Sequence, residues 1–228
     1  MNKKFYLLTM LALTGLMICS TLILAVNSPA GTNPELKSIQ LLPPQTDGGK
    51  PLMQVLKDRK SSREFGAEKL PPQILSNLLW AANGINRQDS GKRTAPSAVN
   101  WQEIDVYVAM AEGLYLYDAK GHVLKPVLAQ DVRAATGRQE FVKDVPVNLI
   151  YVADFTRMGD VSAEEKVFYS AADTGFIAEN VYLYCASEGL ATVVRNLIDK
   201  PALSKIMKLR AEQRVILAQS VGYPKKQQ

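Results

Sequence analysis

The chain has 228 residues, of which 47% are hydrophobic and 21% are charged, as in an ordinary globular protein with one large domain or at most two small ones. Its formal charge of +5 falls to +3 (5 − 2) when Lys3 and Lys4 of the N-terminal segment are set aside. This mild excess, without a basic stripe interleaved with aromatic residues, argues against a nucleic-acid partner and fits the binding of a small anion.

Residues 1 to 26 have the pattern of an export signal. Two lysines precede a run from Phe5 to Val26 that contains no charged residue. The run is about 22 residues long, which is also enough to span a bilayer, so a cleaved signal peptide and a retained membrane anchor both stay open. We therefore expect an exported protein that is periplasmic or anchored through residues 5 to 26, with no other contact with a membrane.

Residues 27 to 50 are rich in proline, glycine and polar side chains, which predicts a linker. No internal repeat and no second stretch of that kind follows, so residues 51 to 228 are predicted to form one domain. Cys185 is the only cysteine after the N-terminal segment, so this domain cannot form an internal disulfide, and Cys185 is expected in the core.

The domain is predicted to mix helices with antiparallel strands. In chain order we expect a short helix over 51–60, a helix that begins at Pro72 and ends near Gly84, a long loop over 86–102, and two strands that turn at residues 112 and 113 and again at 119–122. A helix over 131–137, a buried strand over 147–155, a long helix over 163–188 capped by Gly189, a strand and loop over 191–199, a short helix over 200–209 and a last strand over 214–224 follow. Strands and helices do not alternate regularly, so the predicted class is α+β.

The segment "RKSSREF", residues 59 to 65, carries the densest basic cluster. If it is extended, the side chains of Arg59, Ser61 and Arg63 point to the same side. The planar fork of arginine suits a phosphate or a carboxylate, and a serine hydroxyl adds a donor. A solvated helix end is the alternative, because cations also favour the carbonyl end of a helix. The segment alone leaves both interpretations open.

Several common chemistries lack their residues. The only histidine, His122, falls at a predicted hairpin turn, so neither a zinc site nor a Ser-His-Asp or Cys-His relay can be assembled around it. No glycine-rich phosphate loop follows a predicted strand. The sequence therefore favours a positively charged pocket whose chemistry an organic cofactor supplies, with no metal.

Five segments together resemble the flavin-dependent nitroreductase family, in particular its dehydrogenase-like branch. In chain order they are "RKSSREF", "LLWAANGINR", "RTAPSAVNWQEIDVYV", "AADTGFIAENVYLYCASEGLATVV" and "VILAQSVGYP". The resemblance covers about residues 51 to 226. It implies a nitroreductase-like α+β fold, in which helices flank a central, mostly antiparallel sheet, and an intertwined homodimer with FMN at the interface between two subunits.

The resemblance also implies roles for individual residues. Arg59 and Ser61 match positions that grip the FMN phosphate and ribityl chain, Arg63 matches a basic position near the phosphate or the flavin pyrimidine edge, and Lys60 continues the motif through its backbone. The loop that reaches across the dimer to the partner's flavin corresponds to Pro96, Ser97, Ala98 and Asn100.

Two further contacts follow from the same resemblance. A backbone amide of Asn196 or Leu197 would face flavin N5, although several family members carry Glu-Gly at these two positions. Lys225 lies where the family often has a C-terminal phosphate contact, with a solvated tail as the alternative.

The implied activity is that of an FMN-dependent oxidoreductase without a catalytic side chain. Hydride would pass through flavin N5 from a reduced donor to a small organic acceptor, nitroaromatic or quinone-like, in a ping-pong cycle. NAD(P)H is a possible donor, but an exported domain would lie apart from the cytosolic pool. The alternative is an exported FMN-binding dimer with little turnover that serves as a binding or electron-transfer module.

Overall fold

The computed structural model describes residues 35–226 of the chain. The predicted export signal or membrane anchor of residues 1 to 26 lies outside the described residues, as does the first part of the predicted linker. Within residues 35–226, no helix combines the length and the hydropathy that a bilayer span requires.

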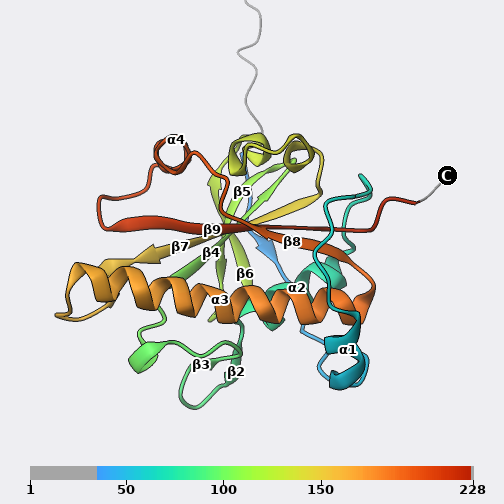
Figure 1. Cartoon of the computed structure of the whole chain (residues 1–228), viewed down its shortest axis with the longest axis horizontal. Helices are drawn as coiled ribbons and strands as arrows, with labels where there is room; N and C mark the ends of the chain where they lie inside the picture. Colours follow the sequence, from blue (N-terminus) through green and yellow to red (C-terminus); the bar gives the residue numbers. More distant parts are fainter. Residues whose placement is uncertain (1–34, 227–228) are drawn as a thin grey trace, which may run out of the picture. The chain divides into compact units, whose positions relative to one another are not determined.

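A seven-stranded sheet forms the centre of the domain, and every pairing in it is antiparallel (Figure 1). Its strands, in spatial order, are β1 (Ile39–Gln40), β6 (Val123–Leu128), β5 (Gly113–Asp118), β4 (Ile104–Met110), β7 (Val147–Asp154), β9 (Gln213–Gly222) and β8 (Ala191–Arg195). The predicted central antiparallel sheet is confirmed.

Helices cover both faces of this sheet, because its strands carry apolar residues on both sides. On β4, Val106 and Val108 pack into one core cluster while Tyr107 and Ala109 pack into another, as the two-residue period of a strand requires. The first cluster is closed by α2 (Pro72–Asn83) and α3 (Ala163–Glu188), and the second by α4 (Lys200–Ile206) and a single-turn helix η2 (Arg133–Thr136) (Figure 1). The α+β class is confirmed.

The long helix α3 has the predicted limits and is fixed at both ends. Ser162 and Glu165 form a reciprocal capping box at its start, and Gly189 ends it in the left-handed conformation with φ of 70°. Its buried residues recur every three or four positions, from Ser170 to Cys185. One side of α3 is therefore bound to the sheet, and α1 (Leu52–Asp58) packs beside its C-terminal half (Figure 1).

Three segments differ from expectation. Within the predicted linker, β1 pairs with β6 and Leu41 is buried, because the apolar "SIQLL" run can add a strand to the sheet edge. The predicted long loop opens with a small ribbon of β2 (Ile85–Arg87) and β3 (Lys92–Arg93). The helix predicted over 131–137 is only the four-residue turn η2, because an extended Gly137 follows it.

We predict that Gly189→Ala lowers the free energy of unfolding by about 1 kcal/mol, because a Cβ is unfavourable at positive φ. Space is not the cause, since no heavy atom lies within 4 Å of the added Cβ. Urea unfolding measures the effect. Gly189→Asn is the matched variant and should lose less, because asparagine tolerates this conformation; an equal loss in both variants would contradict the conformational explanation.

Candidate functional site

The basic segment runs extended beside β8. Arg59 ends α1 with extended backbone angles, and the amide of Ser62 donates to the carbonyl of Thr192 at 2.9 Å. Side chains then alternate: Lys60 and Ser62 line a cavity of about 440 Å³, whereas Arg59 and Ser61 lie against the side chain of Tyr182. The extended interpretation is correct, and the helix-end alternative is wrong beyond residue 59.

Tyr182 of α3 links this segment to β8, and sequence reasoning missed it. Its hydroxyl accepts from the amide of Val194 at 3.0 Å and lies 2.8 Å from the hydroxyl of Ser61. A tyrosine hydroxyl has one proton, which is therefore free to go to Ser61, so the proton of Ser61 can be donated outward to an anion. Arg59 lies over the same ring, 5.3 Å from its centroid. The only signal in the sequence was a tyrosine, with its polar hydroxyl, within the largely apolar stretch of the long helix.

Several cations of this region are not engaged in ion pairs, although Asp58 and Glu64 also line the cavity. Among residues 35–226, no Asp or Glu forms an ion pair with Arg59, Lys60, Arg63 or Lys225. Lys60 and Lys225 line the same cavity, and the amide of Lys225 holds the tail by donating to the carbonyl of Glu64 at 3.2 Å. The C-terminal tail therefore lies beside the basic segment, where Lys225 can add a positive charge to a site for an anion.

Asn196 and Leu197 follow directly after β8, and both are exposed. Among the described residues, their amides donate to no loop, cap or side-chain acceptor, whereas the carbonyl of Leu197 accepts from the amide of Arg138 at 3.0 Å. The side chain of Leu197 is 55% exposed although it is apolar. Two available backbone donors thus stand at a fixed position beside an apolar surface.

Directly before these amides, Arg195 is a buried cation, only 4% exposed. Its guanidinium donates to the carbonyl of Thr136 at 2.8 Å, to Oδ1 of Asn148 at 2.9 Å and to the hydroxyl of Ser220 at 3.2 Å, all neutral acceptors. Burial lowers the pKa of Arg195 to about 10, so the side chain stays charged at neutral pH. The sequence signal was a lone charge at the end of the apolar run "ATVV".

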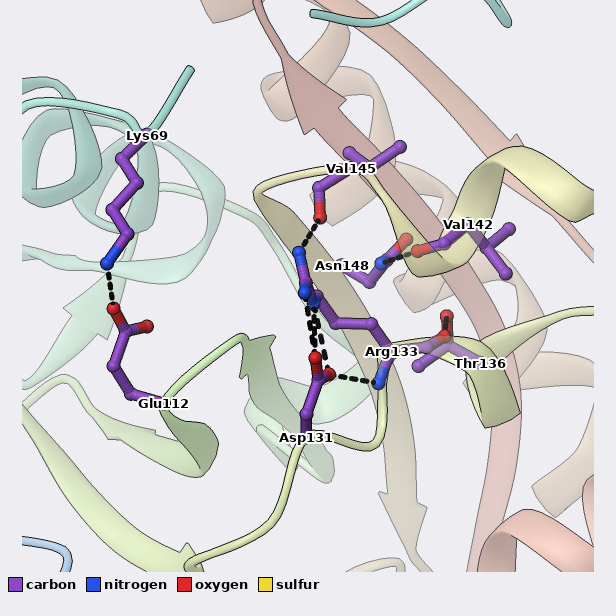
Figure 2. Close-up of polar contacts among 8 residues, drawn as sticks. All are labelled: Lys69, Glu112, Asp131, Arg133, Thr136, Val142, Val145 and Asn148. Atoms are coloured by element: carbon purple, nitrogen blue, oxygen red, sulfur yellow. Dashed lines mark hydrogen bonds and ion pairs between the residues drawn. The ribbon is translucent and has the colours of Figure 1, made fainter. Parts of the chain in front are cut away.

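The side chain of Asn148 is in turn fixed by its neighbours. Its Nδ2 donates to the backbone carbonyl of Val142 at 2.8 Å, as Figure 2 shows. Its oxygen accepts both from Arg195 and from the hydroxyl of Ser220 at 2.6 Å. The position of the β8 end therefore depends on a buried polar network that joins β7, β8, β9 and η2.

A second cavity, of about 670 Å³, was not predicted from the sequence. It is lined by apolar residues such as Leu41, Leu75, Met110 and Val147, and its rim carries Lys69 and Arg133. Figure 2 shows that both cations are already engaged, Lys69 with Glu112 and Arg133 with Asp131 and the carbonyl of Val145. No predicted site residue lines this cavity, and its paired charges make it a poorer anion site than the basic segment.

The predicted flavin-contact loop, residues 96–100, contacts α3 at a different position from the basic segment. Pro96 and Ser97 border a small cavity with Asp173, and the amide of Ala98 donates to Oδ2 of Asp173 at 2.9 Å. Val99 and Asn100 have positive φ values of 51° and 60°, and Val99 is 83% exposed. A β-branched residue in this conformation is strained, so the loop is held in its shape by its surroundings.

Within one chain the loop and the basic segment are kept apart. Asp173 and Tyr182 are nine residues apart on α3, which corresponds to two and a half turns and about 13 Å along the axis. They flank the buried stripe of the helix on its two sides. The structure therefore brings together Arg59, Lys60, Ser61 and Lys225 but not the residues of the Pro96 loop.

Comparison with known proteins identifies the family. The model of the nitroreductase family matches residues 56–223. A nitroreductase homologue of Methanocaldococcus jannaschii is 30% identical over 169 residues, which cover 70% of this chain and 85% of the relative. The chain belongs to the nitroreductase family and is thus an oxidoreductase.

Solved structures agree. A crystal structure described as a nitroreductase from Ralstonia eutropha is 44% identical, with a TM-score of 0.81 over 86% of this chain and 93% of that one. The NADPH:FMN oxidoreductase of Vibrio harveyi, solved with NAD⁺, has a TM-score of 0.59 at 18% identity over 77% of this chain and 69% of that one, which shows a shared fold. The expected nitroreductase-like fold is confirmed.

We predict that Gly137→Ala lowers the free energy of unfolding by about 2 kcal/mol, because the added Cβ would overlap Nη1 of Arg195 and displace a buried cation from its acceptors. Gly48→Ala is the control, since no heavy atom lies within 4 Å of its added Cβ, and it should change stability by less than about 0.5 kcal/mol. Equal effects in urea unfolding would show that Arg195 is not held tightly.

Proposed function

We propose that the protein is an FMN-dependent oxidoreductase that passes hydride through flavin N5 between a reduced donor and a small organic acceptor, nitroaromatic or quinone-like, in a ping-pong cycle. The observation that carries this proposal is that Arg59 and Ser61 both lie against Tyr182, whose hydroxyl is fixed by β8, next to a cavity that Lys60 and Lys225 line. FMN, when bound, supplies the hydride chemistry, and the chain supplies binding, orientation and electrostatics.

The donor set suits the phosphate of FMN. A dianionic phosphate needs several charge-assisted donors, and the guanidinium of Arg59 and the outward proton of Ser61 would supply two of them. Lys60 and Lys225 would add positive charge from the adjoining cavity, which Tyr182 also lines. Arg63, two residues after Ser61, is exposed and would add positive charge near the phosphate or the flavin pyrimidine edge. Because the ring of Tyr182 lies beneath Arg59, the guanidinium would lose little conformational freedom on binding.

The end of β8 would orient the flavin ring. The amides of Asn196 and Leu197 are available to donate a hydrogen bond toward N5, and a backbone donor does not depend on the side chain that has replaced Glu-Gly. The exposed side chain of Leu197 would present an apolar surface to the substrate. No titrating side chain is required in this arrangement, which agrees with the single histidine of the chain.

We propose that two copies of the chain complete the site. The Pro96–Asn100 loop and the basic segment lie on opposite sides of α3, so a loop that contacts flavin would reach the flavin of a partner subunit. The side of α3 away from the sheet exposes Phe168 and Phe176, and α1 exposes Leu52 and Met53. Such an apolar surface on one chain supports burial against a second copy.

The electron donor and the location of the protein are proposed from two further observations. The Vibrio harveyi protein with the same fold is an NADPH:FMN oxidoreductase, which supports NAD(P)H as a donor. The uncharged N-terminal run supports export, and an exported protein would require a different donor, such as a quinol or another flavoprotein. We propose export with an extracytoplasmic donor.

The second candidate is an exported FMN-binding dimer with little turnover. The replacement of Glu-Gly by Asn196 and Leu197 favours it, because the exposed Leu197 side chain stands where substrate would approach the flavin. Stopped-flow measurements with nicotinamide and quinol donors distinguish the two: slow reduction of bound flavin by every donor would favour the binding role.

We predict that the purified protein is yellow and that Arg59→Ala weakens FMN binding at least tenfold, because a charge-assisted phosphate contact is lost. Tyr182→Phe should weaken binding about fivefold, since the relay to Ser61 is broken but no charge is removed. Fluorescence titration with FMN measures both.

Lys57→Ala, an exposed cation in the last turn of α1, is the matched control and should bind as the unmodified protein does. Colourless protein that takes up no FMN would refute the proposal. Parallel lines in double-reciprocal plots with two substrates are the expected kinetic result for a ping-pong cycle.

We also predict that Phe168→Asp shifts the protein from dimer to monomer in sedimentation velocity and lowers FMN affinity with it, because a charge would be placed on the apolar side of α3, where Phe168 is 67% exposed. Val127→Asp on β6 is the control, since Val127 is also an exposed apolar residue but lines a cavity beside α4, which covers the opposite face of the sheet from α3. A monomer that binds FMN as tightly as the unmodified protein would refute the shared site.

A further inference from the structure

Glu103 lies at the end of the Pro96–Asn100 loop, directly before β4, and its side chain is completely buried. Both carboxyl oxygens lack a hydrogen-bond donor among the described residues. Such an orphaned carboxylate would be costly, because burial removes water without replacing its hydrogen bonds. A neutral carboxylic acid avoids most of this cost.

The neighbour that faces Glu103 is another acid, Asp173 of α3, which is 3% exposed. Two carboxylates in contact repel each other, whereas a carboxylic acid can donate its proton to a carboxylate. Burial first, and then the charge and hydrogen bonding of Asp173, raise the pKa of Glu103 to about 7. Geometry and charge therefore agree that Glu103 holds a proton at mildly acidic pH.

Other charged groups around Glu103 do not neutralise it. Arg157, which follows β7, donates from Nη2 to the backbone carbonyl of Glu103 at 2.9 Å, and its charge is directed to Asp105 at 2.7 Å. Asp154 contacts the same backbone carbonyl through its amide at 2.9 Å and adds negative charge nearby. Arg93 of β3 donates to the side chain of Gln102 at 2.8 Å. The proton on Glu103 is thus the main compensation for Asp173.

Asp173 is also the anchor of the loop, through the bond that its Oδ2 accepts from the amide of Ala98. All three residues with positive φ beyond this anchor lie in the left-handed region, and two of them, Val99 at 51° and Gln102 at 50°, are strained there, whereas asparagine tolerates the 60° of Asn100. A loop in such a conformation persists only while its contacts hold it. The contact between Ala98 and Asp173 joins this strained segment to the acid pair.

We propose that Glu103 is a positioning residue: its carboxylic acid donates a proton-mediated hydrogen bond to Asp173, and the shared proton keeps Asp173 in place to hold the Pro96–Asn100 loop in its strained shape. When Glu103 ionises, the two carboxylates repel and the loop is released. This inference rests on the proposed function in one respect, namely that the loop contacts the flavin of the partner subunit.

The first test follows the loop itself and needs no flavin. Hydrogen exchange of the Ala98 amide, corrected for its intrinsic rate, is measured from pH 6 to pH 9 in the full chain. We expect protection to fall with a midpoint near pH 7 in the unmodified protein. Glu103→Gln keeps a donor to Asp173 and cannot ionise, so it should keep full protection across the range. Identical pH profiles for the two proteins would overturn the inference.

Asp173→Asn is the second variant and keeps the test decisive if Glu103→Gln fails to fold. Its amide can donate to the Glu103 carboxylate while its oxygen still accepts from Ala98, so it should also remove the pH dependence. Glu140→Gln, an exposed glutamate in the short helix Glu140–Lys143, is the control and should behave as the unmodified protein does. A midpoint shifted by Glu140→Gln would also overturn the assignment.

The second test measures FMN affinity across the same pH range. One proton coupled to the loop should weaken binding by up to tenfold for each pH unit above 7 in the unmodified protein, and Glu103→Gln should remove this slope. Failure of FMN to bind at any pH would refute the proposed function while leaving the Ala98 result to decide the inference. A slope that Glu103→Gln leaves unchanged would overturn the inference and leave the proposed function intact.

The pH dependence of the free energy of unfolding gives an independent test of whether Glu103 carries a proton. Because the pKa of Glu103 is raised from its ordinary value of 4.5 to about 7, the protonated acid contributes stability that is fully present below pH 4.5 and is lost as pH rises toward 7. Urea unfolding should show this loss in the unmodified protein and a smaller one in Glu103→Gln. The same loss in both proteins would place the titrating group elsewhere.

Discussion

The buried stripe of α3 is the constraint on which the rest of the structure depends. Ile177 and Val181 lie in the core cluster that covers one face of the sheet, and this contact fixes the rotation of the helix about its axis. Once that rotation is fixed, Tyr182 must face α1 and β8 on one side, and Asp173 must face the Pro96–Asn100 loop on the other. Packing of apolar side chains thus decides where two polar contacts of the candidate site occur.

Two buried ionisable side chains without partners of opposite charge lie beside the candidate site. Arg195 is a buried cation held only by neutral acceptors, and Glu103 is a buried acid whose pKa is raised to about 7 by burial and by the neighbouring Asp173. Each lies directly beside a segment of the candidate site, Arg195 before Asn196 and Glu103 after the Pro96–Asn100 loop. Elsewhere, as with Arg133 and Asp131 in Figure 2, partly buried charges are paired in the ordinary way.

The site residues differ in how far the sequence could place them. Arg59, Ser61 and Arg63 were predicted to share one side because the side chains of an extended chain alternate, and the structure places Arg59 and Ser61 together against Tyr182. Tyr182 was missed because its role depends on Val194 and Ser61, which are distant in sequence and meet only after α3 packs on the sheet. Arg195 was missed for the same reason, since its acceptors come from β7, β9 and η2.

The sequence by itself determined the class, the central antiparallel strands, the limits of α3 and its cap at Gly189, because these follow from periodicity and from preferences that act over a few residues. It also carried the resemblance that family comparison confirmed. Only the tertiary structure decided that residues 39 to 42 join the sheet edge, that Tyr182 completes the basic segment, and that Glu103 meets Asp173. These contacts join segments far apart in the chain, so their energies depend on long-range packing that no local pattern records.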